Sequence, residues 1–183
     1  MRTRRRLSIG VVVLAALGAA PLSGQARTAQ GGTDGYLSAL GEYFRVPAEE
    51  VSILTEWNLG SEEIPVVLFL ARRGGGSADA LVALKRGGQS WFDLGRRYGL
   101  DAAAYHVTLP ESADAGALAS AYQKYRAAPS GSWGGITLQD REVVGLVNLR
   151  FLSEFLGVPP ARVLDAAGRS GSFVQAYGAL QRR

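Results

Sequence analysis

Apolar residues follow one another at helical spacing along most of this chain, and glycine or proline interrupts them repeatedly. Leu37, Leu40 and Phe44 share one helical face, and the run from Val66 to Leu70 is apolar nearly all round. Glycines follow at 74–76 and 87–88, where helices commonly end. Short helices of this kind bury their apolar faces by packing together, so we predict an all-α fold, an irregular helical bundle.

Capping residues predict where the helices start. Ser77 and Ser90 precede helical spacing, and their hydroxyls can accept hydrogen bonds from the first free N–H groups. Pro47 suits a first helical turn, because proline lacks the N–H that this turn leaves unpaired. Further helices are expected from Ser61, from Thr137 and over 113–126.

Two parts of the chain resemble each other at an offset of 112 residues. Leu40–Val51 shares five residues in register with Leu152–Val163, and residues 90–99 resemble 172–178. We therefore predict about three copies of a short helix-turn-helix-type unit. They occupy residues 36–100 and 138–183, joined by a Gly/Pro/Tyr-rich connector over 101–137, and residues 36–183 are expected to form one compact domain.

The first residues have the three parts of an export signal. Four arginines between positions 2 and 6 give a basic start, an apolar run continues to Ala20, and small residues allow cleavage near Ala26. The apolar run is shorter than the roughly 20 residues that span a bilayer, which favours a signal peptide over 1–26 rather than an uncut anchor. We expect a periplasmic or secreted protein, exported by general secretion or the twin-arginine route, with a flexible leader over 27–35 and no transmembrane segment after processing.

Composition excludes several kinds of chemistry. The chain has no cysteine and one histidine, which excludes disulfides, cysteine nucleophiles and multi-histidine metal sites. We expect no metal and no cofactor. Removing the four signal arginines leaves 16 of the 20 Lys+Arg against 16 Asp+Glu, so the exported chain has no net charge. A neutral chain has no general attraction for nucleic acid, which disfavours that partner.

Residues 81–100 resemble the helix-turn-helix of resolvases and many transcription regulators. A helix, a glycine turn and Ser90 precede a second helix that carries Arg96 and Arg97. In that hypothesis the two arginines face nucleic acid. Trp91 and Phe92 stand where a recognition helix needs polar side chains, so a unit of helix packing is the favoured interpretation.

Aromatic residues gather around the connector and supply the candidate ligand site. Such rings favour binding surfaces, because they bury area and keep a hydrogen bond, so an exposed groove for a peptide or glycan is one hypothesis. The alternative is that the rings fill the gap between the two helical halves. His106, the sole imidazole, defines a third hypothesis, an envelope hydrolase. The candidate groove residues are Tyr98, Tyr105, Tyr122, Tyr125, Trp133 and Arg126.

Four short motifs stand out in the later part of the chain: Ser90-Trp91, Tyr105 to Pro110, Ala121-Tyr122 with Tyr125, and Val147 to Phe155 with Val158-Pro159-Pro160. Together they resemble an uncharacterised family of exported bacterial helical-repeat proteins. The resemblance covers roughly residues 60–180 and implies fold and export, but no activity. These patterns predict a non-catalytic binding or interaction protein of the bacterial cell envelope, whose partner is a protein, peptide or glycan. A helix-turn-helix nucleic-acid-binding protein is the alternative.

Overall fold

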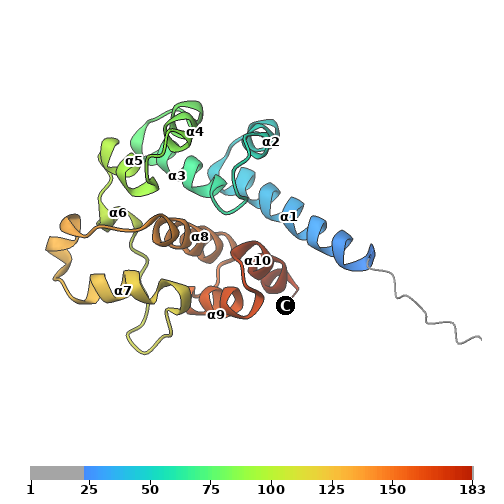
Figure 1. Ribbon diagram of the computed structural model, residues 1–183. Helices are drawn as coiled ribbons and strands as arrows, with labels where there is room; N and C mark the ends of the chain where they lie inside the picture. Colours follow the sequence, from blue (N-terminus) through green and yellow to red (C-terminus); the bar gives the residue numbers. More distant parts are fainter. Residues whose placement is uncertain (1–22, 183) are drawn as a thin grey trace, which may run out of the picture.

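A computed structural model describes residues 23–182, and every regular element in that range is helical (Figure 1). The predicted all-α helical bundle is therefore confirmed. None of the helices in this range is long and apolar enough to cross a membrane. The α-helices are α1 (Ser23–Phe44), α2 (Ala48–Glu56), α3 (Ile64–Gly74), α4 (Ala78–Arg86), α5 (Trp91–Arg97), α6 (Ala102–Tyr105), α7 (Ala119–Arg126), α8 (Asp140–Leu156), α9 (Pro160–Ser170) and α10 (Phe173–Gln181), and the 3₁₀-helices are η1 (Gly116–Leu118) and η2 (Ser130–Gly135).

Helices α3 and α8 pack on each other at the centre of the molecule. Every residue from Ile64 to Leu70 of α3 is buried, as its uninterrupted apolar character predicts. Helices α4 and α5 pack on α3, and α9 and α10 pack on α8. Figure 1 shows these two groups on opposite sides of the α3–α8 contact. The core therefore runs through the junction of the two halves of the chain.

Hydrogen bonds between the halves begin two of the helices. Glu62 Oε1 accepts from the backbone N–H of Phe173, at the start of α10, at 2.6 Å. Asp140 Oδ1 accepts from the backbone N–H of Trp91, at the start of α5, at 2.6 Å. A carboxylate at a helix start pairs a free N–H and offsets the positive end of the helix dipole. Each half thus caps a helix of the other.

The N-terminal helix is longer than the sequence predicts. Residues 27–35, expected as a flexible leader, continue α1, which begins at Ser23. The segment contains Gly31 and Gly32 but no proline, so the helix anchored by the buried Tyr36 and Leu40 can extend through it. Figure 1 shows this part of α1 projecting beyond the other helices. Residues 1–22 of the expected signal peptide lie outside the described residues.

The helix starts predicted at Ser77 and Ser90 are confirmed, and three others are wrong. The helix expected over 113–126 begins only at Ala119, after the separate 3₁₀-helix η1. The Ser77 and Ser90 side chains accept from the N–H groups of Ala80 and Asp93 and begin α4 and α5. Helix α3 begins after Glu63 rather than at Ser61. Helix α8 begins after Gln139 rather than at Thr137. Gln139 and Glu142 form a capping box at this start.

The connector, residues 101–137, contains α6, η1, α7 and η2. Its tyrosines are buried: Tyr105 is fully covered, and Tyr122 and Tyr125 are 3% and 2% exposed. Helix α6 packs on η2 and on α8. The segment is therefore part of the core rather than a separate arm.

The internal repeat stays a prediction, although matched positions share their surroundings. Leu40 and Leu152 are both fully buried. Val51 and Val163 are also buried, each on the helix that follows. The shared Val-Pro step lies between two helices in both copies.

Candidate functional site

The connector tyrosines hold the fold together and do not line an open groove. The Tyr122 hydroxyl donates to the backbone oxygen of Val107 at 2.7 Å, and the Tyr125 hydroxyl donates to that of Ala102 at 2.7 Å. Burial raises the pKa of Tyr122 to about 12. The Tyr105 hydroxyl is buried and has no hydrogen-bond partner among residues 23–182. These three rings are buried in side-chain packing: Tyr105 lies beside Phe69 and Phe92, and Tyr122 and Tyr125 lie beside His106.

The other members of the candidate groove are more exposed but do not form a ligand site with them. Trp133 is half-buried, and its Nε1 donates to the backbone oxygens of Tyr125 and Ala128 at 3.0 Å. Tyr98 is half-buried against Gly74 and Gly76. Arg126 is exposed and donates to the backbone oxygen of Glu111 at 3.3 Å. Each side chain therefore serves local packing.

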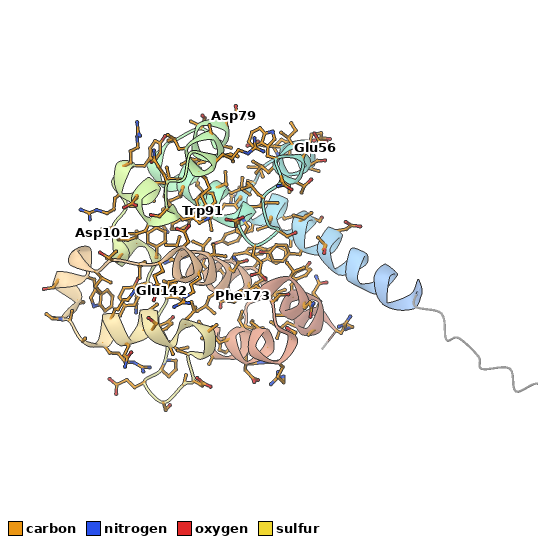
Figure 2. The ribbon with its side chains drawn as sticks, viewed as in Figure 1. Glu56, Asp79, Trp91, Asp101, Glu142 and Phe173 are labelled. Carbon is orange, nitrogen blue, oxygen red and sulfur yellow. The ribbon has the colours of Figure 1, made fainter. Side chains whose placement is uncertain are left out.

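The start of α5 is not available to read DNA bases. Trp91 is fully buried and Phe92 is 1% exposed. The Trp91 Nε1 donates to Glu63 Oε1 at 2.9 Å, and Figure 2 shows its ring between α5 and α8. Arg96 and Arg97 are exposed, but they lie in the last turn of α5. A recognition helix contacts bases through its first turns, so this arrangement favours helix packing.

His106 belongs to an aromatic cluster. Its ring centroid lies 4.2 Å from that of Trp133 and 4.8 Å from that of Tyr125. Burial lowers the pKa of His106, and the positive charge of Arg150 lowers it further. In the described part of the chain, no serine or carboxylate forms a hydrogen bond with this ring. A hydrolytic triad needs both partners, so the geometry does not favour a hydrolase.

Four arginines converge on a small cavity where α1, α3 and α8 meet. The cavity has a volume of about 260 Å³. Among the described residues, four arginines and one carboxylate line it, so it has an excess of positive charge. The chain from Arg27 onward has as many acidic as basic residues, which makes this concentration a local feature. The lining residues are Tyr43, Phe44, Arg45, Phe69, Arg72, Arg73, Arg150 and Glu154.

Arg45 stands at a position that favours glycine. It follows α1 with φ of 56°, and Val46 N–H bonds back to Gly41 O at 3.0 Å, which forms a Schellman ending. Gly157 occupies the matched position after α8, with φ of 63°. A left-handed conformation costs a non-glycine residue on the order of 1 kcal/mol. The chain therefore carries a guanidinium here at a cost in stability, and strained positions of this kind cluster at functional sites.

The remaining arginines are held by aromatic rings and backbone oxygens. The guanidinium carbons of Arg73 and Arg150 lie 5.5 and 5.8 Å from the centroid of the Phe69 ring. Arg72 Nη1 donates to Tyr43 O at 3.3 Å. Arg150 Nη2 donates to the backbone oxygens of Ala104 and His106 at 3.1 and 2.7 Å. Arg150 thus uses Nη2 for the backbone and its Nε is buried, which leaves Nη1 as the group on the side of Glu154.

Glu154 is the one carboxylate that lines this cavity. Its Oε2 accepts from the Tyr43 hydroxyl at 2.5 Å, and its Oε1 lies 4.0 Å from Arg150 Nη1. Burial and this hydrogen bond raise the pKa of Tyr43 to about 12, so the hydroxyl keeps its proton at neutral pH. Arg150 is the only one of the four arginines with an ion pair in the described residues. Chemically, this arrangement is suited to holding an anion.

A larger cavity, of about 510 Å³, lies between the two halves and is lined by Glu62, Glu63 and Asp140 together with apolar residues. All three carboxylates already accept hydrogen bonds from the chain, two of them at helix starts. No group of three or more acidic or histidine side chains in the described residues could hold a metal ion. The carboxylates of this cavity are therefore explained by the fold.

Sequence analysis missed the arginine cavity. Arg72 and Arg73 fit the preference for positive charge at the C-terminal end of a helix. Because this preference explains them fully, their place in a cavity was not predicted. The signal that could have found the site is the aligned pair Arg45 and Gly157. An arginine where the matched helix ending has glycine indicates a side chain kept for another reason.

No family model, no curated protein and no solved structure matches this chain.

Proposed function

We propose that the protein is an exported, non-catalytic binding protein of the bacterial cell envelope, and that its ligand is an anion held in the arginine cavity. The observation that carries the proposal is the convergence of Arg45, Arg72, Arg73 and Arg150 on one cavity with one carboxylate. Guanidinium groups recognise carboxylate and phosphate oxygens through paired donors. Export is supported by the basic start and apolar run of residues 2–20.

The cost of Arg45 supports a binding role over a purely structural one. A residue kept for stability would relieve strain at its site, and glycine would do so here. Arg72 and Arg73 are exposed at the end of α3, and Arg45 is exposed beside α1. Their charges face solvent without an ion pair in the described residues. An anion that binds there gains several charge-assisted hydrogen bonds and displaces only water.

Replacing Arg45 with glycine separates function from stability. We expect Arg45→Gly to raise the free energy of unfolding by about 1 kcal/mol, because the left-handed strain disappears. The same change removes a charged donor worth roughly 1.5–3 kcal/mol to a bound anion, so affinity should fall about tenfold or more. Urea denaturation measures the first effect. Calorimetric titration with inorganic phosphate, sulfate and citrate measures the second.

Arg96→Ala is the matched control. Arg96 is exposed on α5, does not line the cavity, and its loss changes net charge equally. We expect it to leave anion affinity unchanged. Absence of binding by all three anions, or equal weakening by the two variants, would refute the proposed site.

Intact mass of the protein from fractionated cells tests export, and a species that begins near Arg27 is expected.

A further inference from the structure

We propose that the arginine cavity selects an oxyanion that carries a proton, such as hydrogen phosphate, over one that carries none, such as sulfate, and that Glu154 makes this selection. This inference rests on the proposed function. The ligand chemistry is a phosphate group, either free or at the end of a larger molecule. The inference is based on Glu154, a negatively charged hydrogen-bond acceptor that lines the cavity beside four arginines.

The wall of the cavity combines four arginines with one carboxylate among the described residues. The four arginines donate only, because a guanidinium has no acceptor. Glu154 accepts only, because an ionised carboxylate has no proton to give. The Tyr43 hydroxyl donates a hydrogen bond to Glu154 Oε2 at 2.5 Å, which fixes the carboxylate and leaves Oε1, 4.0 Å from Arg150 Nη1, outside that bond. Glu154 lines the same cavity as the four arginines, so a ligand bound there lies beside this acceptor.

The presence of Glu154 has opposite consequences for the two oxyanions. Sulfate has no proton near neutral pH, so its oxygens would face the carboxylate with like charge and no hydrogen bond. Inorganic phosphate keeps at least one proton, and that P–OH can donate to Glu154 while the remaining oxygens accept from the arginines. A single charge-assisted hydrogen bond of this kind corresponds to roughly tenfold in affinity or more.

The expected preference for phosphate over sulfate does not follow from the total positive charge of the cavity. A site built from arginines alone would favour the anion with the greater charge and would bind sulfate well. Glu154 is exposed on α8, so replacing it should leave the fold intact. Its Tyr43 partner can donate equally to the oxygen of a glutamine. Glu154→Gln therefore tests the selection with little structural change.

The experiment is calorimetric titration of the full chain, as purified from cells, with inorganic phosphate and with sulfate at pH 7. We expect the unaltered protein to prefer phosphate by about tenfold or more. Glu154→Gln should reduce that preference to near unity, because an amide can donate to sulfate. Glu42→Gln, which removes an equal charge from α1 outside the cavity, should keep the preference.

The outcomes separate this inference from the proposed function. If both anions bind equally and Glu154→Gln changes nothing, the selection is refuted while anion binding stands. If neither anion binds, the proposed function fails as well. Vesicles that contain phosphatidic acid distinguish the two sources of phosphate. Retention on such vesicles, reversed by inorganic phosphate, assigns a lipid-borne phosphate, and phosphate binding without retention assigns a free ligand.

Discussion

Substituting Gly95 with alanine sets helix propensity against packing. Gly95 lies inside α5, where alanine would normally stabilise by about 1 kcal/mol. A Cβ at this position would, however, collide with the Tyr105 hydroxyl and lie 3.1 Å from its Cζ. Tyr105 is fully buried, so its ring has little room to move. Overpacking of a core typically costs 1–3 kcal/mol, so after the gain in helix propensity we expect a net loss of up to about 2 kcal/mol.

The partner substitution shows whether the hydroxyl is the cause. Tyr105→Phe removes a buried oxygen that has no hydrogen-bond partner, so it should be neutral or stabilising. It also removes the atom that the new Cβ meets. In that background Gly95→Ala should regain most of its helix propensity, which gives a coupling energy of about 2 kcal/mol between the two sites.

Urea denaturation followed by circular dichroism provides the four free energies of unfolding for this cycle. Gly168→Ala is the matched control, because Gly168 lies in α9 and an added Cβ there meets no atom within 4 Å. It should stabilise by about 1 kcal/mol. A Gly95→Ala variant as stable as the Gly168→Ala variant would refute the packing argument. So would an equal loss with and without the Tyr105 hydroxyl.

Three further predictions concern buried polar groups. Asn148→Ala should cost about 2–4 kcal/mol in urea denaturation, because it leaves the buried Tyr36 hydroxyl without its acceptor; a loss below 1 kcal/mol would contradict this. Burial alone would raise the pKa of Glu142, but hydrogen bonds from Lys124 and nearby groups lower it overall. The ionised carboxylate therefore stabilises the fold above the ordinary glutamate pKa, and this stabilisation is lost as the pH falls through the lowered pKa. The urea midpoint should therefore decrease on acidification, and less steeply in Glu142→Gln. Because burial lowers the pKa of His106, its contribution is likewise present above the ordinary histidine pKa and lost as pH falls through the lowered value. The fluorescence of Trp133, measured as the difference from Trp133→Phe, should report a midpoint below 6.5, and a midpoint above it would contradict the burial argument.

Local signals in the sequence predict the helices well. Ser77 and Ser90 cap helices as expected, because a cap depends only on the residues of the first turn. The apolar run of α3 predicts a buried helix for an equally local reason. The leader over 27–35 could not be predicted in this way. Residues 27–35 are helical because they continue α1, and α1 is held by its packing on other helices, including α10.

The roles of the aromatic and basic residues required the tertiary structure. The residues Tyr105, Tyr122 and Tyr125 have the same composition whether they line a groove or fill the core, and only their burial distinguishes the two. The hydrogen bonds that Glu62 and Asp140 accept connect the two halves of the chain and join residues far apart in the sequence. Sequence alone explains these carboxylates as charges near helix starts, without indicating which helix they cap.

By itself, the sequence determined the helical class, the helix starts at Ser77 and Ser90 and the neutral charge of the expected exported chain, because spacing, capping and composition act locally or sum over residues. The tertiary structure alone decided that Arg45, Arg72 and Arg150 meet in one cavity with Glu154. They come from the end of α1, the end of α3 and the middle of α8. Their separation depends on how those three helices cross, and crossing geometry is set by side-chain packing across the whole core.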